Sequence, residues 1–237
     1  MEAASRYHRD TLEFARAITF FDAVYAIALT LLVVNVEPPP REAWTSLGAV
    51  LDAGLGGHLL GFAVSFAVIA VFWRANHRLL SGFRGLTPQL IAANLVGLAF
   101  VVLIPFTTQA ISDPETSDAP LAIAFYAVDI SAAVLGSVGV YWLARAQDAL
   151  VVRPPLRVEL VRLADILLTP VVFLLSIPIA YAWGADAGRW TWLALLVLAP
   201  ISGVLSGRAT RRMLADAGSG ESDAGAAADT DADTAAG

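Results

Sequence analysis

Residues 16–34 read RAITFFDAVYAIALTLLVV, and the long apolar run within them decides the fold class. We predict that this run forms a helix from about Ala17 to Val36, which ends before the sequence Glu37-Pro38-Pro39-Pro40. A helix of about 20 residues covers about 30 Å, the thickness of the hydrocarbon layer of a bilayer. The run therefore predicts a membrane-spanning helix.

The composition of the whole chain agrees with a membrane protein. Of its 237 residues, 57% are hydrophobic and 15% are charged, and the mean hydropathy is +0.68. A soluble domain carries about a quarter charged residues. This balance argues against a soluble helical protein, because too few charged residues remain to form a water-facing shell.

Five further apolar runs are long enough to cross a bilayer. They extend from about Leu47 or Leu51 to Trp73, Pro88 to Ile111, Pro120 to Ala144, Leu160 to Trp183 and Trp190 to Gly207. We therefore predict an all-α integral membrane protein with six transmembrane helices.

The basic residues, which are all arginine, indicate the orientation. If the N-terminus is cytoplasmic, thirteen of the fifteen arginines fall in inside segments, and only Arg41 and Arg189 fall outside. Loops on the cytoplasmic side of membrane proteins carry an excess of Arg and Lys. We therefore expect both termini on the cytoplasmic side. The use of arginine alone, together with a pI near 5.0, indicates a prokaryote, so we expect the protein in the plasma membrane of a prokaryote.

The predicted spans divide the chain into three parts. Residues 1–16 form a cytoplasmic N-terminus, and residues 17–210 form the six-helix transmembrane domain. Residues 211–237 are acidic and, from Ala215 onward, contain no large apolar side chain. Such a segment cannot bury enough surface to offset its ordering entropy, so we expect a disordered, solvated tail.

The sequence offers little for catalysis. It has no cysteine and three histidines, and it contains no HExxH motif, Gly-rich phosphate loop or Thr-Val-Gly-Tyr-Gly carbonyl filter. We therefore expect no enzyme activity, no cofactor, no metal site and no nucleic-acid partner.

The first predicted helix carries an acidic residue, Asp22, about five residues inside the membrane. Even at the centre of a membrane helix, a carboxylate costs about 2.5–3.5 kcal/mol on insertion scales. Asp22 therefore needs a partner on a neighbouring helix, or a functional reason to be there.

This helix resembles the first helix of prokaryotic relatives of the lysosomal potassium channel called transmembrane protein 175. Their hallmark is an Arg, then Phe-Ser-Asp, then Val-Phe-Ala-Ile-Ala-Ile-Thr-Leu-Leu-Val. The positions that match are Arg16, Phe20, Asp22, Val24, Ala26, Ile27, Ala28 and Thr30 to Val33. Further matches are Phe72-Trp73, His77, Asn94 and Leu103-Ile104-Pro105-Phe106. Phe21 departs from the family's Ser, and Ala23 departs from its Gly.

The resemblance implies a function and an assembly. Family members of this size assemble as homotetramers in the bilayer and conduct potassium ions passively through a central pore lined by the first helix of each subunit. Large aliphatic side chains form the constriction, and a Thr layer contributes to potassium preference. By motif position, these side chains are Ile27, Leu31 and Val34, with Thr30 as the selectivity residue.

The helical geometry of this segment can be checked separately from the resemblance. At about 100° per residue, Phe20, Ala23, Thr30, Leu31 and Val34 fall with Ile27 on one stripe about 100° wide. Asp22 lies well off this stripe, at about −140° from Ile27. It is therefore expected to face a neighbouring helix rather than the ion path.

The remaining motif residues are expected to form a structural network around Asp22. Trp73, His77 and Asn94 lie near the same cytoplasmic depth and are candidate partners of the carboxylate. Arg16 is a cytoplasmic anchor or a member of the network.

Two other functions remain open from the residues alone. Asp129 lies deep in the fourth predicted helix, and buried carboxylates in membranes mark proton or ion paths. The alternative is therefore a proton- or sodium-coupled secondary transporter that uses Asp129. A membrane scaffold without ion flux is the third possibility.

Overall fold

A computed structural model describes residues 6–34, 36–113 and 115–213 of the chain. Within this part, six helices are long and apolar enough to span a membrane. They are α1 (Leu12–Val34), α3 (Leu55–Ser81), α4 (Pro88–Ser112), α5 (Pro120–Ala146), α6 (Leu156–Trp183) and a final span, Ala185–Met213. The final span begins with α7 (Ala185–Trp192) and, after a turn at Leu193, continues as helix over residues 194–213. The chain is thus a multi-pass membrane protein.

Short elements lie at the two ends of the bundle. The strands β1 (Tyr7–His8) and β2 (Gly85–Leu86) pair antiparallel, so the described chain is mostly but not wholly helical. At the opposite end, a 3-10 helix (Arg41–Thr45) and the helix α2 (Leu47–Asp52) connect α1 to α3.

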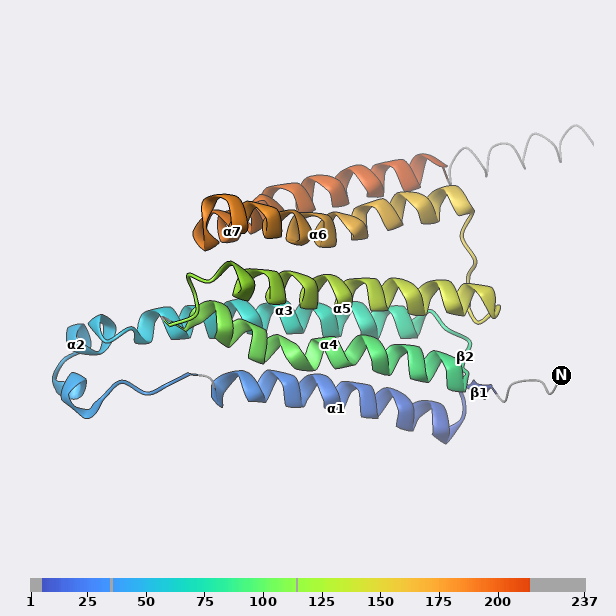
Figure 1. Cartoon of the computed structure of the whole chain (residues 1–237). Helices are drawn as coiled ribbons and strands as arrows, with labels where there is room; N and C mark the ends of the chain where they lie inside the picture. The colour runs from blue at the N-terminus through green and yellow to red at the C-terminus, as the bar shows by residue number, and fades with distance from the viewer. Residues whose placement is uncertain (1–5, 35, 114, 214–237) are drawn as a thin grey trace, which may run out of the picture.

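The long helices run side by side (Figure 1). The helix α4 packs against both α1 and α5, α5 packs against α6, and α6 packs against α7. The start of α1, the loops after α3 and α5, and the end of the final span all lie at the end marked by β1 and β2. These are the segments in which the sequence concentrates arginine.

The first span begins five residues earlier than predicted. Thr11 precedes α1, and its hydroxyl accepts a hydrogen bond from the backbone N–H of Phe14 at 3.3 Å, which satisfies one of the unpaired N–H groups of the first turn. Charged side chains at Glu13 and Arg16 are exposed there and do not interrupt the helix. Polar residues near the N-terminal end of the run were therefore a poor guide to where the helix starts.

The second predicted span is two helices. A break separates α2 from α3 at Gly54, whose φ of +90° favours glycine because an L side chain is strained there. The helix α3 also continues eight residues beyond Trp73, to Ser81, with Arg74 and Arg78 exposed on its last turns. A helix can extend beyond the hydrocarbon layer, so hydropathy alone placed its end too early.

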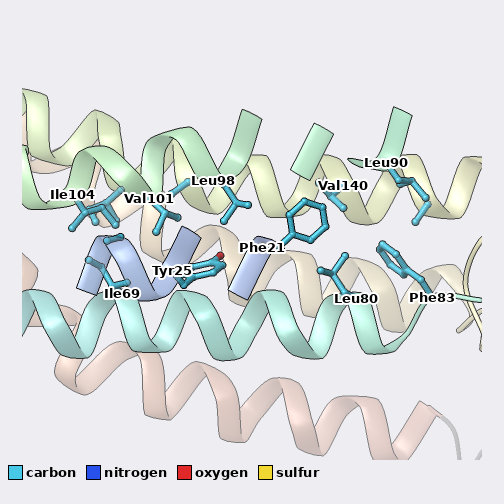
Figure 2. Packing of buried hydrophobic residues seen from close by; sticks show 14 of the residues in the cluster. Phe21, Tyr25, Ile69, Leu80, Phe83, Leu90, Leu98, Val101, Ile104 and Val140 are labelled. Atoms are coloured by element: carbon cyan, nitrogen blue, oxygen red, sulfur yellow. The ribbon is translucent and has the colours of Figure 1, made fainter. Parts of the chain in front are cut away.

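The buried core joins α1, α3 and α4, with α5 behind them. Phe21 and Tyr25 of α1 lie among Ile69 of α3 and Leu98 and Val101 of α4 (Figure 2). Phe21, which stands where the resembling family has Ser, is only 1% exposed and fills this core. The larger side chain at this position therefore packs between helices, on the side of α1 away from its exposed face.

Two glycines lie where the backbones of α4 and α5 come close together. A Cβ atom placed on Gly136 would lie 2.8 Å from the Cα atom of Gly97. These glycines let the two helices pack at a distance that a larger side chain at residue 136 would prevent.

The predicted acidic tail falls almost entirely on residues 214–237, which lie outside the described residues. Helical structure extends to Met213, three residues beyond the predicted end of the transmembrane domain at residue 210.

Candidate functional site: the exposed face of the first helix

The helix α1 has two different faces within one copy of the chain. Phe21, Tyr25, Ala28 and Leu32 are buried against α3 and α4. This spacing of four, three and four residues places them on one side of the helix. That side fixes how α1 is rotated in the bundle.

The opposite side of α1 carries the predicted stripe and is uncovered. Ile27 is 57% exposed, and Leu31, Val34 and Phe20 are also exposed. Thr30 belongs to the same exposed stripe. The structure therefore brings all four predicted pore residues to one exposed surface of α1.

Thr30 has its hydroxyl tied to its own helix. The Oγ1–H group donates to the carbonyl oxygen of Ile27 at 2.8 Å, a local bond that threonine side chains form within helices. Because the proton is used in this bond, the oxygen lone pairs remain free to accept from water or to bind a cation.

Asp22 is held by the neighbouring helix α3. The indole Nε1–H of Trp73 donates to Asp22 Oδ1 at 2.8 Å. The ring of His77 lies next to Trp73, with 5.9 Å between the ring centroids. The carboxylate thus faces a neighbouring helix, as expected from its position on the helical wheel, and Trp73 is its partner.

Two other members of the predicted network stand apart from this hydrogen bond. Asn94 is buried on α4, and its Nδ2 atom has no hydrogen-bond partner among the described residues. Arg16 is exposed, and none of the ion pairs found among the described residues includes it. The structure therefore joins Asp22, Trp73 and His77, and leaves Asn94 and Arg16 outside their contacts.

The deep carboxylate of Asp129 lies between α4 and α5. It is 4% exposed, and its Oδ2 atom accepts a hydrogen bond from Thr107 Oγ1 at 2.9 Å. Its other oxygen, Oδ1, has no partner among the described residues. The sequence predicted that Asp129 lies deep in a helix. It did not predict Thr107 as the partner, because the two residues lie on different helices.

A second buried carboxylate, Glu159, was missed from the sequence. It accepts hydrogen bonds from the hydroxyl of Tyr141 at 2.6 Å and from the guanidinium of Arg145, with which it forms an ion pair. The predicted fifth helix began at Leu160, which placed Glu159 in a loop. The actual start at Leu156 puts this carboxylate inside the helix and against α5.

Comparison with known proteins agrees with the first-helix motif. Residues 16–105 match the model of the family described as "Endosomal/lysosomal potassium channel TMEM175". A potassium channel of Streptomyces collinus is 29% identical over 136 residues, which cover 55% of this chain and 64% of that protein. The mouse endosomal/lysosomal proton channel TMEM175 is 33% identical over 104 residues, which cover 41% of this chain and 21% of that protein. The chain thus spans less than two thirds of the length of these relatives.

Solved structures show the same fold over more of the chain. A lysosomal potassium-selective channel TMEM175 homologue from Chamaesiphon minutus superposes with a TM-score of 0.63 and 24% identity, covering 83% of this chain and 99% of that one. A variant of the potassium channel MtTMEM175 superposes with a TM-score of 0.55 and 19% identity, covering 90% of this chain and 98% of that one. The likeness in fold therefore extends beyond the matched residues 16–105.

Proposed function

We propose that this chain is the subunit of a potassium-selective channel that conducts passively through a pore lined by α1. Four copies would surround one axis, with Ile27, Leu31 and Val34 forming the constriction and Thr30 contributing to selectivity. The observation that carries the proposal is the uncovered stripe of α1, which holds all four of these residues on one surface.

The packing of α1 supports this assembly. Its other face is fixed by buried aromatic and aliphatic side chains, so the helix cannot turn the stripe inward without losing that core. A stripe fixed in this way would face the axis in each of four copies, and each copy would then cover the others' exposed side chains.

The side chains on the stripe suggest how conduction would be controlled. A narrow ring of Ile27 and Leu31 would exclude water, and narrow apolar constrictions gate by dewetting. The Thr30 oxygen, whose proton is donated to Ile27, would present an acceptor to the ion near this ring. Selectivity would then depend on side chains instead of on a backbone carbonyl filter.

The hydrogen bond between Trp73 and Asp22 would act as a brace for the pore helix. It joins α1 to α3 on a side of the helix away from the stripe. Asp22 would therefore hold α1 in place without contacting the permeant ion.

The proposed orientation rests on the charges. Thirteen arginines lie in segments at or near one end of the bundle, which would be the cytoplasmic end, with both termini there. We place the protein in the plasma membrane of a prokaryote, with residues 211–237 as a cytoplasmic tail.

The test is potassium flux into liposomes that contain the purified full chain. Replacing Leu31→Ala should widen the constriction and change the flux, and Leu31→Asn should wet it and raise the flux. Val33→Ala is the matched control, because Val33 is also exposed and apolar but lies about 120° from Ile27 on the helix. Absent flux, or equal flux in all four proteins, would contradict the proposal.

The transporter alternative has one observation in its favour: the Oδ1 atom of Asp129 has no hydrogen-bond partner among the described residues. It requires saturable uptake coupled to protons or sodium, and this uptake should be lost in Asp129→Asn. If that variant conducts potassium like the unmodified chain, the alternative is excluded.

A further inference from the structure

A groove of about 780 Å³ lies on the side of the bundle formed by α3, α5, α6 and the helix of residues 194–213. Aliphatic and aromatic side chains such as Val64, Val134 and Phe173 line most of it. Polar and charged side chains gather where α5 ends and α6 begins, namely Tyr141, Trp142, Glu159, Arg162 and Asp165. The groove is thus amphipathic along its length.

Glu159 lines this polar end and is only 3% exposed. Its Oε1 atom accepts from both Tyr141 and Arg145, whereas its buried Oε2 atom has no partner among the described residues. A buried carboxylate oxygen without a donor is costly, and such groups in native proteins call for an explanation. A hydrogen-bond donor supplied by a bound molecule would satisfy it.

The charges at the polar end are mixed in sign. Arg162 is exposed, and none of the ion pairs among the described residues uses it. Asp165 accepts a hydrogen bond from the Ser202 hydroxyl, and no cation pairs with it in that part of the chain. A bound molecule with a purely anionic head group would meet the carboxylates of Glu159 and Asp165. A purely cationic head group would leave Arg162 unpaired. A head that carries a phosphate and a primary ammonium matches both.

The apolar part of the groove fits a lipid tail. On α3 the lining from Val64 to Leu79 is wholly apolar and extends over fifteen residue steps, or about 22 Å at 1.5 Å per residue. One leaflet contributes about half of the 30 Å hydrocarbon layer. The apolar wall is therefore long enough for the acyl chain of one leaflet, with its head at the arginine-rich end.

From these features we propose that the groove is a binding site for a zwitterionic aminophospholipid, phosphatidylethanolamine, from the leaflet at the arginine-rich end. The Arg162 guanidinium binds the phosphate, and the ammonium donates to Glu159 Oε2 and Asp165. The acyl chain packs along α3, α5 and α6. The site lies on helices other than α1 and does not depend on whether the protein conducts ions.

The test is native mass spectrometry of the purified full chain titrated with phosphatidylethanolamine, phosphatidylcholine and phosphatidylglycerol. Phosphatidylcholine has no N–H donor, and phosphatidylglycerol has no ammonium. Each should bind at least about tenfold more weakly than phosphatidylethanolamine, the loss that one charge-assisted hydrogen bond represents.

Two pairs of variants locate the site. Arg162→Gln should weaken phosphatidylethanolamine binding about tenfold, whereas Arg157→Gln, an exposed arginine on the same helix outside the groove lining, should leave it unchanged. Val138→Trp should fill the groove and abolish binding. Val128→Trp, at an exposed position of α5 that does not line the groove, should not.

Three results would overturn the proposal. Equal or tighter binding of phosphatidylglycerol would mean that only Arg162 acts on the head. Unchanged binding in both Arg162→Gln and Val138→Trp would mean that the lipid binds elsewhere. Loss of the oligomer in Val138→Trp, with lipid binding retained, would mean that a second copy of the chain occupies the groove.

Discussion

The contact between Gly136 and Gly97 gives the sharpest stability prediction. A Cβ atom on Gly136 would lie 2.8 Å from a backbone atom, the Cα of Gly97, which cannot move by a simple rotation. Carbon atoms pack best at about 3.5–4.0 Å. In Gly136→Ala, the helices α4 and α5 must therefore separate by about 0.7 Å or more.

The size of the effect follows from two opposing contributions. Overpacking a well-packed site costs about 1–3 kcal/mol. Alanine is favoured over glycine within a helix by about 0.5–1 kcal/mol. With central values of about 2 and 0.75 kcal/mol for these two contributions, the net expectation for Gly136→Ala is a loss of about 1 kcal/mol in the free energy of unfolding.

The chain supplies two matched controls. Gly139 lies on the same helix, and a Cβ atom there meets nothing within 4 Å, so Gly139→Ala should be neutral or stabilising. A Cβ atom on Gly97 would lie 3.6 Å from the Cα and carbonyl carbon atoms of Gly136. This is an ordinary van der Waals distance, so Gly97→Ala should be tolerated. The two partners in one contact are thus expected to differ.

The measurement is the unfolding temperature of the purified protein in detergent, followed by tryptophan fluorescence. For a chain of this size, 1 kcal/mol shifts the midpoint by about 2–4 °C, so Gly136→Ala should unfold about 2–4 °C lower. If Gly136→Ala is as stable as Gly139→Ala, or if Gly97→Ala is the more damaging of the pair, the packing argument is refuted.

Two further changes test single hydrogen bonds. Trp73→Phe removes the donor to Asp22 and should cost about 1.5–3 kcal/mol, the range for bonds to charged groups. An unfolding temperature equal to that of the unmodified chain would show that this bond contributes nothing. Tyr141→Phe removes one donor to buried Glu159 and should cost about 1–3 kcal/mol, whereas Tyr181→Phe, at an exposed position, should cost almost nothing. Equal unfolding temperatures in these two variants would contradict the assignment.

The sequence predicted the number and approximate place of the spans, because the hydrocarbon layer requires long apolar helices. Their ends were less predictable. The Thr11 cap, the Gly54 break and the extension of α3 to Ser81 depend on local hydrogen bonds and backbone angles that hydropathy does not measure. The largest consequence was at α6, whose start was predicted four residues too late. For that reason Glu159 was not recognised as a buried residue of the helix.

The sequence by itself determined the stripe on α1 and the need of Asp22 for a partner, since helical periodicity and the cost of a charge in hydrocarbon are local properties. Only the tertiary structure decided that Trp73 is that partner, that Thr107 binds Asp129, and that the stripe stays uncovered while Phe21 is buried. These outcomes depend on how each helix is rotated against its neighbours, and that rotation is set by packing among residues far apart in the chain.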